Sequence, residues 1–325
     1  MKKVIIDCDP GHDDAIAIML AAQHLDILGI TTVGGNGYLE NVTRNALQIL
    51  EVIDRTDIKV YPGHAGPSTA KLVIADNVHG ESGMEGPVLP QPKIKAQEKH
   101  GVDFIVETVM STDDVTLIAT GPLTNIASAL NKEPRIAQRV TEISFMGGGA
   151  YCGNWTPAAE FNIFVDPEAA YKVVNSGAKI KMCGVNLTRQ AIMSVEDKEE
   201  MRAYNTKAGI FTAELLDFFG GGKEARMHDA SAVAWVIDED VFKGAMLHVD
   251  IELCGRLTRG MTVTDLRFMQ TEKVDVDFDF ESTRRWDDEP EGSTFRGKEP
   301  NVNVGMRCDI ERFRKLLKGA IAKYK

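Results

Sequence analysis

The chain has 325 residues, of which 43% are hydrophobic and 26% are charged, values that are ordinary for a soluble globular protein. Its 37 basic and 48 acidic side chains give a formal net charge of −11 at pH 7, which argues against nucleic acid as a partner because nucleic-acid binders usually carry a basic face. No apolar stretch approaches the roughly 18 residues that span a bilayer, so we expect no membrane partner either.

The first two thirds of the chain alternate short apolar runs with helical patterns. Val4 to Ile6 has the pattern of a buried strand, and Ala15 to Leu25 that of a helix opened by Asp13 and Asp14. The alternation continues with strands at Ile27–Val33, Val115–Ala119, Ile143–Met146 and Ile180–Val185 and helices at Asn41–Ile53, Leu123–Leu130 and Pro167–Val174. This order implies right-handed βαβ crossovers and a mostly parallel open sheet flanked by helices. The sequence contains no internal repeat or low-complexity linker, so we predict a single α/β domain over residues 1–325.

The C-terminal third has a different pattern. Residues 195–219 are expected to be entirely helical, and His228 to Ile237 to form a buried helix. Apolar residues at alternate positions predict antiparallel edge strands with one wet face, at Val249–Leu253, Val274–Phe280 and Val302–Met306. Residues 282–300 are rich in charge, Gly and Pro and are expected to form a surface loop, or alternatively a lid or subunit contact. An amphipathic helix from Cys308 to Tyr324 closes the chain.

The cysteines and the first residues predict a cytoplasmic protein. Five cysteines are scattered along the chain, at Cys8, Cys152, Cys183, Cys254 and Cys308. Their odd number and the lack of a C-x-x-C pair are typical of reduced thiols rather than a disulfide framework. Met1 to Lys3 leads directly into the first apolar run, so we expect no targeting segment.

Four carboxylates fall within eight residues, at the point where the first predicted strand meets the first predicted helix: Asp7, Asp9, Asp13 and Asp14. Pro10-Gly11 forces a turn, so the loop brings several carboxylates towards one point. Two acids at a helix start are commonly capping residues, but four around one turn favour a bound cation that neutralises them. Oxygen ligands without a nearby Cys/His set favour Ca²⁺ or Mg²⁺ over zinc.

Other polar and glycine-rich segments follow the remaining predicted strands. They are Val33–Asn36, Thr120–Asn125, Gly147–Gly149 and Asn186. Ligands of open α/β sheets bind beyond the carboxyl ends of the strands, so we expect these loops to line one pocket. Asn154 and Glu160 to Asn162 are polar where a core is expected, and His228-Asp229 opens an otherwise apolar helix. Considered without the other segments, a histidine at the start of a buried helix, such as His228, is more often a helix cap or a core histidine than a functional residue.

Together these segments resemble the inosine–uridine preferring nucleoside hydrolase family over essentially the whole chain. The most specific segment begins at Asp7 and is similar to the family signature DxDxGxDDxxA. Supporting segments follow in the family's order, at Val42–Ala46, His79–Gly83, Thr120–Asn125, Met146–Gly149, Glu160–Asn162 and His228-Asp229. The resemblance implies a Rossmann-like nucleoside hydrolase fold, a small ribonucleoside substrate that is hydrolysed to free base and ribose, and a homodimer or homotetramer.

The resemblance also implies roles for particular residues. A Ca²⁺ ion at the pocket floor would be held by Asp9, Asp14, the backbone carbonyl of Thr120, and Asp229. The ribose would be contacted by Asp13, Asn36, Met146, Asn154, Glu160 and Asn162, and the base by His79 and His228. Asp9 is suited to take a proton from a Ca²⁺-oriented water, and His228 to protonate the leaving base. We therefore expect His228→Ala to slow inosine hydrolysis severely.

Several alternatives stay open on the sequence. A D-x-D after a buried strand also marks aspartyl-phosphate enzymes, although Pro10 to Asp14 does not fit their pattern. A non-catalytic nucleoside- or cation-binding protein would bind Ca²⁺ without releasing base, and another N-riboside is a possible substrate on the same fold. The base preference also stays open, because Phe218 to Lys223 is Gly-rich where relatives often supply aromatic residues.

Overall fold

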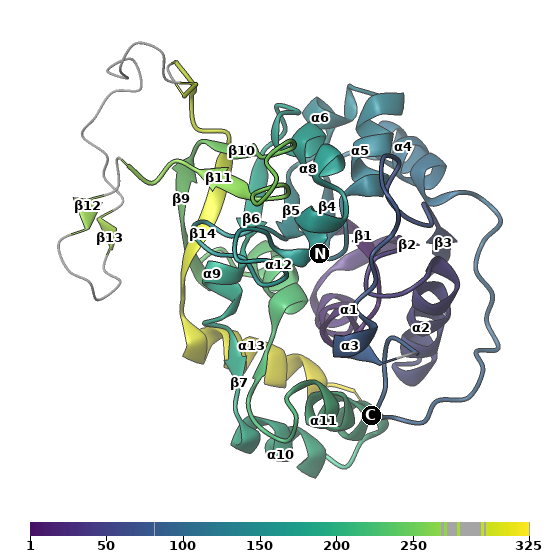
Figure 1. Cartoon of the computed structure of the whole chain (residues 1–325). Helices are drawn as coiled ribbons and strands as arrows, with labels where there is room; N and C mark the ends of the chain where they lie inside the picture. The colour runs from purple at the N-terminus through teal and green to yellow at the C-terminus, as the bar shows by residue number, and fades with distance from the viewer. Residues whose placement is uncertain (81, 268–269, 272–277, 280–293, 296, 325) are drawn as a thin grey trace.

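An eight-stranded sheet forms the centre of the computed structural model, which describes residues 1–80, 82–267, 270–271, 278–279, 294–295 and 297–324 (Figure 1). In spatial order the strands are β3 (Val60–Pro62), β2 (Asp26–Thr32), β1 (Lys3–Cys8), β4 (Val115–Ala119), β5 (Ile143–Met146), β6 (Ile180–Cys183), β14 (Val302–Cys308) and β9 (Phe242–Leu247). All neighbours pair in parallel except β14 and β9, which are antiparallel. The predicted α/β fold with a mostly parallel sheet is confirmed.

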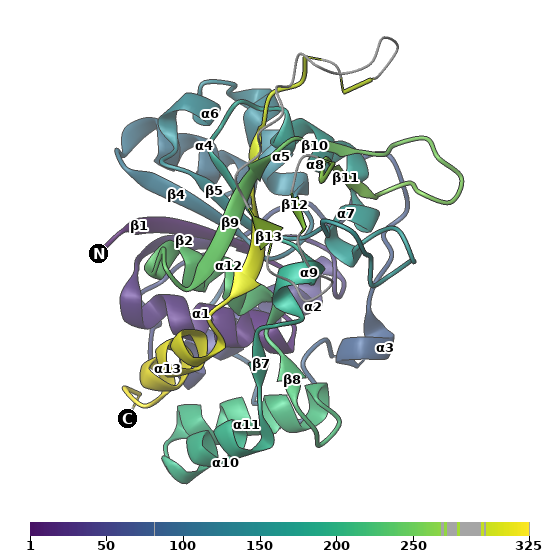
Figure 2. The same ribbon diagram turned by 90° about the vertical axis from the view of Figure 1, so that its left-hand side faces the viewer.

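Helices cover both faces of this sheet (Figure 2). Buried side chains on one face pack against α1 (His12–His24), α2 (Leu39–Val52), α11 (Lys207–Phe219), α12 (His228–Ile237) and α13 (Ile310–Ile321). Those on the other face pack against α4 (Gly101–Ser111), α5 (Thr124–Lys132), α6 (Ile136–Arg139) and α8 (Pro167–Val174). Val4 and Ile6 belong to the first core and Ile5 to the second, because successive side chains of a strand point to opposite faces.

Shorter elements lie around this framework. They are the helices α3 (Asp76–His79), α7 (Phe161–Val165), α9 (Val185–Thr188) and α10 (Val195–Ala203), and the paired strands β7 (Ile192–Met193) with β8 (Ala225–Arg226), β10 (Val249–Ile251) with β11 (Thr262–Thr264), and β12 (Gln270–Thr271) with β13 (Phe278–Asp279). Among the described residues, no helix has the length and apolar character needed to cross a membrane.

The strand order places a crevice beside β1. The sheet continues through β2 and β3 on one side of β1 and through β4 and β5 on the other. In open α/β sheets, ligands bind at such a switch point, beyond the carboxyl ends of the strands. Asp9 follows β1 and Thr120 follows β4, so the topology brings these two distant segments together.

The prediction that residues 195–219 are entirely helical is wrong at residues 204–206, which separate α10 from α11. Asn205 has a left-handed backbone with φ of 53°, which ends α10. The hydroxyl of Thr206 then accepts a hydrogen bond from the Gly209 N–H at 3.1 Å and caps the start of α11.

The prediction that residues 302–306 form an edge strand is also wrong. β14 lies inside the sheet, parallel to β6 and antiparallel to β9, and the edge position belongs to β9, a strand that the pattern did not predict. The alternation of apolar and other residues suggested a strand with one solvent-exposed face, because Asn303 and Gly305 separate the apolar residues. A Cβ on Gly305 would lie 3.2 Å from the Trp235 ring, so the absent side chain leaves room for helix packing.

Two predictions fall largely on residues outside the described part of the chain. Of the strand predicted at 274–280, the structure describes Phe278–Asp279, which pairs with β12. Of the loop predicted at 282–300, it describes residues 294–295 and 297–300. The other C-terminal strand prediction agrees in part, because β10 spans Val249–Ile251 and pairs antiparallel with β11.

Candidate active site

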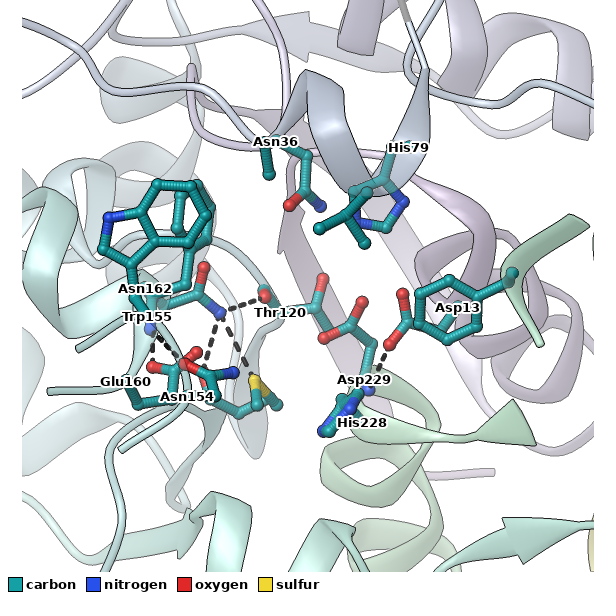
Figure 3. Close-up of a pocket in the computed structure, with 15 residues that line it drawn as sticks. Asp13, Asn36, His79, Thr120, Asn154, Trp155, Glu160, Asn162, His228 and Asp229 are labelled. Carbon is teal, nitrogen blue, oxygen red and sulfur yellow. Dashed lines mark hydrogen bonds between the residues drawn. The ribbon is translucent and has the colours of Figure 1, made fainter. Parts of the chain in front are cut away.

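A pocket of about 220 Å³ lies where the loops after the central strands meet. Its walls are formed by Asp13, Asn36, Ala75, Val78, His79, Thr120, Met146, Asn154, Trp155, Glu160, Phe161, Asn162, Phe219, His228 and Asp229. All of the predicted site residues therefore line it except Asp9 and Asp14, which are fully buried behind its wall. Figure 3 shows Asn154, Glu160 and Asn162 grouped on one side, with Asp13 and Asp229 facing them.

Asp9 is held in a narrow space behind the pocket wall. Its Oδ2 accepts a hydrogen bond from the Asn36 N–H at 2.6 Å, and its backbone oxygen accepts one from Asn36 Nδ2 at 3.1 Å. Its Oδ1 is buried and has no hydrogen-bond partner among the described residues. A buried carboxylate oxygen without a partner is costly, so this atom has the character of a ligand or base towards a group that binds there.

Two glycines allow this close approach to the Asp9 carboxylate. A Cβ on Gly121 would lie 2.6 Å from Oδ1, and a Cβ on Gly35 would collide with Oδ2. We expect Gly35→Ala to displace the carboxylate and to lower kcat by about 10²-fold or more, since small misplacements of a reacting group have effects of this size. Gly319→Ala is the control, because this glycine lies in α13 with open space around it. Equal kcat values for the two variants in a base-release assay would contradict this prediction.

Three more carboxylates form a cluster. Asp13, Asp14 and Asp229 each place one oxygen within 4.8 Å of the others. Burial and the charge of Asp14 raise the pKa of Asp13 to about 7, and burial and the charge of Asp13 raise the pKa of Asp229 well above its usual value. Burial and the charge of Asp14 likewise raise the pKa of Asp9. The ionised forms are therefore costly together unless a cation lies among them.

The donor set of this cluster fits a hard divalent cation. Asp14 accepts hydrogen bonds from the Thr120 hydroxyl at 2.7 Å and the Gly11 N–H at 3.0 Å, which fix its orientation. Asn162 Nδ2 lies 2.7 Å from the Thr120 backbone oxygen and fixes that carbonyl in the pocket wall. Carboxylate and carbonyl oxygens of this kind are the ligands that Ca²⁺ prefers. The unpartnered Oδ1 of Asp9 adds a further oxygen to the set.

The opposite side of the pocket is lined by polar side chains that are held by hydrogen bonds. Glu160 Oε2 accepts from the backbone N–H groups of Gly148 and Asn162, at 2.9 and 3.0 Å, and its side chain caps α7. Burial raises the pKa of Glu160 to about 6. Asn154 Oδ1 accepts from the Phe161 N–H at 2.9 Å. These bonds hold the carboxylate and amide groups in fixed positions, as a site for a polyhydroxylated sugar requires.

Two histidines and an aromatic ring lie on another part of the wall. Burial lowers the pKa of His228 to about 4 and that of His79 to about 3, so both rings are neutral at pH 7. The His228 Nδ1 lies 2.7 Å from the Thr188 hydroxyl. The Phe219 ring stacks on His79 with centroids 5.6 Å apart. This region offers an aromatic surface and imidazole nitrogens, which suit a planar base.

The structure separates Asp7 from the carboxylate cluster. β1 ends at Cys8, so Asp7 belongs to the strand and Asp9 to the loop after it. Asp7 accepts hydrogen bonds from Thr31 Oγ1 at 2.5 Å and Asn125 Nδ2 at 2.8 Å, and it does not line the pocket. Asp7 therefore links β1, β2 and α5 instead of joining the cluster.

Sequence reasoning missed several aromatic and apolar wall residues. They are Ala75, Val78, Trp155, Phe161 and Phe219. The Gly-rich stretch before His228 suggested a base region without aromatic residues, yet Phe219 at the end of α11 lines the pocket. The adjacent pair Phe218-Phe219 was the available signal, but its position against the pocket depends on how α11 packs.

Comparisons with known proteins agree with this geometry. The model of the inosine-uridine preferring nucleoside hydrolase family matches residues 4–315. The chain belongs to this family. It is 46% identical over 275 residues to the pyrimidine-specific ribonucleoside hydrolase RihA of Photobacterium profundum, an alignment that covers 81% of this chain and 89% of the relative. RihA of Escherichia coli (strain K12) is 43% identical over 291 residues, which cover 84% and 94% of the two chains.

Solved structures of nucleoside hydrolases share the fold. A purine-preferring ribonucleoside hydrolase from Gardnerella vaginalis superposes with a TM-score of 0.85 at 29% identity and covers 99% of this chain and 98% of its own. An inosine-guanosine nucleoside hydrolase gives a TM-score of 0.86 at 28% identity over the full length of both chains. The predicted family, fold and ribonucleoside hydrolase activity are confirmed.

Proposed function

We propose that this nucleoside hydrolase depends on Ca²⁺ and prefers pyrimidine ribonucleosides, which it hydrolyses to free base and ribose. The observation that carries the proposal is the cluster of buried carboxylates, of which Asp13 and Asp229 line the pocket, together with the unpartnered Asp9 Oδ1. The pyrimidine preference is supported by the relatives at 43–46% identity, which are pyrimidine-specific, whereas the purine-acting structures are 28–29% identical.

Ca²⁺ would be held by Asp9, Asp14, Asp229 and the Thr120 carbonyl, and when bound it supplies a positive charge that orients a water and the ribose hydroxyls. Asp9 takes the proton of the attacking water, because its Oδ1 is buried and has no other partner among the described residues. Asn36 holds Asp9 in place through its backbone N–H.

The ribose carries the developing charge. Cleavage of an N-glycoside proceeds through an oxocarbenium-like state, with positive charge on the sugar. Asp13 and Glu160 place carboxylates on two sides of the pocket, and the amides of Asn154 and Asn162 add fixed dipoles. Preorganised groups of this kind stabilise the transition state without reorganising during the reaction.

The leaving base gains negative charge as the bond breaks. His228 is neutral and carries one ring proton. In the tautomer with that proton on Nε2, the Thr188 hydroxyl donates to Nδ1 and His228 serves as a hydrogen-bond donor to the base. A neutral ring that gave up this proton would become an imidazolate, so His228 stabilises the leaving base as a hydrogen-bond donor and does not act as the general acid predicted from the sequence.

The base preference is tested by measuring release of free base from uridine, cytidine, inosine, adenosine and guanosine at equal concentration. We expect kcat/KM for uridine and cytidine to exceed the value for inosine by about tenfold or more, a discrimination that pocket contacts of about 1.4 kcal/mol supply. Equal values for inosine and uridine would contradict the pyrimidine preference and leave the reaction class intact.

Removal of Ca²⁺ is expected to abolish base release and to lower Tm. Free Ca²⁺ at about 100 times its Kd stabilises a protein that binds it in the folded state by about 2.7 kcal/mol. Thermal unfolding with excess Ca²⁺ and with a chelator measures this shift, and Asp14→Asn is the matched variant in which the shift is expected to vanish. A Tm and activity that do not respond to the chelator would contradict the metal assignment.

The resemblance to the family also supports a cytoplasmic homodimer or homotetramer. The five cysteines are free in the structure, as the reduced cytosol requires. Light scattering at micromolar concentration measures the assembly, and a monomeric mass would contradict this part of the proposal.

A further inference from the structure

A second histidine lies behind His79 and has no role in the reaction described so far. His12 begins α1 and is fully buried, and its ring stacks on the His79 ring with centroids 5.2 Å apart. The rings of Phe218 and Phe219 stack on His12 with centroids at 5.0 and 5.6 Å. The Nδ1 atoms of the two histidines are 2.9 Å apart, and His12 Nε2 lies 2.7 Å from the backbone oxygen of Glu85.

These two contacts determine where the protons lie. A carbonyl oxygen only accepts hydrogen bonds, so the contact with Glu85 requires a proton on His12 Nε2. Burial among aromatic rings favours the neutral imidazole, which has a single N–H, so His12 Nδ1 carries a lone pair. The bond between the two Nδ1 atoms then takes its proton from His79. His79 is left with a lone pair on Nε2, the nitrogen that makes no hydrogen bond to a described residue.

One further contact favours the opposite assignment. The backbone N–H of His12 points at His79 Nδ1 from 3.4 Å, and this contact would need a lone pair on that nitrogen. A distance of 3.4 Å lies beyond the usual range for an N–H donor, whereas 2.9 Å is typical of a formed hydrogen bond. The contact between the rings therefore decides the tautomer.

We propose that His12 is a positioning residue that fixes His79 as a hydrogen-bond acceptor in the base region of the pocket. The site then selects nucleobases whose edge offers an N–H, such as the N3–H of uracil. This inference rests on the proposed function for its substrate and on the two histidine contacts for its geometry.

The tautomer is measured directly on the unaltered protein. Nitrogen-15 NMR of histidine-labelled protein, loaded with Ca²⁺, separates protonated from unprotonated ring nitrogens by their chemical shifts, and His79→Asn assigns the His79 signals. We expect the proton of His79 on Nδ1 and a lone pair on Nε2. A proton on His79 Nε2 would overturn the proposal without any variant of His12.

Two variants of His12 separate positioning from packing. The Asn side chain places an oxygen near the position of Nδ1 and still accepts from His79, whereas Gln places its amide near the position of Nε2 and keeps only the contact with Glu85. We expect His12→Gln to lower the ratio of kcat/KM for uridine over 3-methyluridine by about tenfold, the value of one hydrogen bond, and His12→Asn to retain it. Equal losses in the two variants would show that His12 acts through packing and would overturn the proposal.

Failure of the proposed function can be distinguished from failure of this inference. If the metal-loaded protein releases base from no nucleoside, the proposed substrate class is wrong. The NMR measurement on the unaltered protein still decides the inference in that case, because the position of the His79 proton does not depend on substrate.

Discussion

Asp9→Asn is expected to lower kcat for uridine by about 10²–10⁴-fold, the usual contribution of a general base. The substituted amide side chain has nearly the same shape as the carboxylate. It keeps an oxygen that can accept the hydrogen bond from the Asn36 N–H, which is 2.6 Å long to Asp9 Oδ2 in the unaltered protein. It cannot take a proton from water at neutral pH, so the loss falls on turnover. Initial rates of uracil release over a range of uridine concentrations separate kcat from KM. A kcat equal to that of the unaltered protein would contradict the role of Asp9 as base.

Asp7→Asn is the matched control for this prediction. Asp7 is also buried and lies two residues away, but its carboxylate is bonded to Thr31 and Asn125 and not to the pocket. We expect it to lower Tm, because it weakens a buried hydrogen-bond network, and to leave kcat within about tenfold of the unaltered value. Similar losses of kcat in both variants would mean that the region responds to disruption as a whole.

His228→Ala is expected to lower kcat for uridine by about 10²–10³-fold, the effect of removing one donor to a developing negative charge. The same variant is expected to retain nearly full activity on a p-nitrophenyl riboside, because p-nitrophenolate leaves without a proton. Both reactions are followed spectrophotometrically with Ca²⁺ present. Equal losses on the two substrates would show that His228 acts on the ribose or on folding and not on the leaving group.

Thr188→Val is the matched control on the other side of the imidazole. Val has the shape of Thr but lacks the hydroxyl that lies 2.7 Å from His228 Nδ1. We expect a smaller loss than in His228→Ala, about tenfold on uridine, with the riboside again nearly unaffected. A loss on both substrates would mean that the hydroxyl supports the fold and does not orient the ring.

The sequence predicted correctly those features that depend only on residue type and on the order of segments along the chain. Carboxylates around Pro10-Gly11, the alternation of strands and helices, and the loops after the strands predicted a pocket at one edge of a parallel sheet, and the structure places most of the expected residues there. The bounds of α8 and α12 agree with the predicted helices, because both begin at clear signals, Pro167 after a capping Asp166 and the polar His228.

The sequence was less informative where the outcome depends on packing. Asp7 and Asp9 are alike in local sequence, but the end of β1 at Cys8 separates their environments. Phe219 reaches the pocket through the packing of α11. The contact between His12 and His79 joins residues 67 positions apart, and its geometry follows from the placement of α3 against the start of α1. Local patterns contain none of these distances.

The structure bears on one of the alternatives that the sequence left open, and an assay separates another. A phosphohydrolase built on Asp7 and Asp9 does not fit, because Asp7 is bonded to Thr31 and Asn125 and lies outside the pocket. A binding protein without activity would bind Ca²⁺ and a nucleoside and release no base, so the same assay separates it from the enzyme.

The most direct test of the account is release of uracil and ribose from uridine in phosphate-free buffer, with Ca²⁺ and after chelation. We predict uracil and ribose in equal amounts with Ca²⁺, because water is the only acceptor, and almost no release with the chelator. The activity should return when Ca²⁺ is added back. No release from uridine, cytidine or inosine by the Ca²⁺-loaded protein would contradict the proposed reaction, and release that the chelator leaves unchanged would contradict the role of the carboxylate cluster as a metal site.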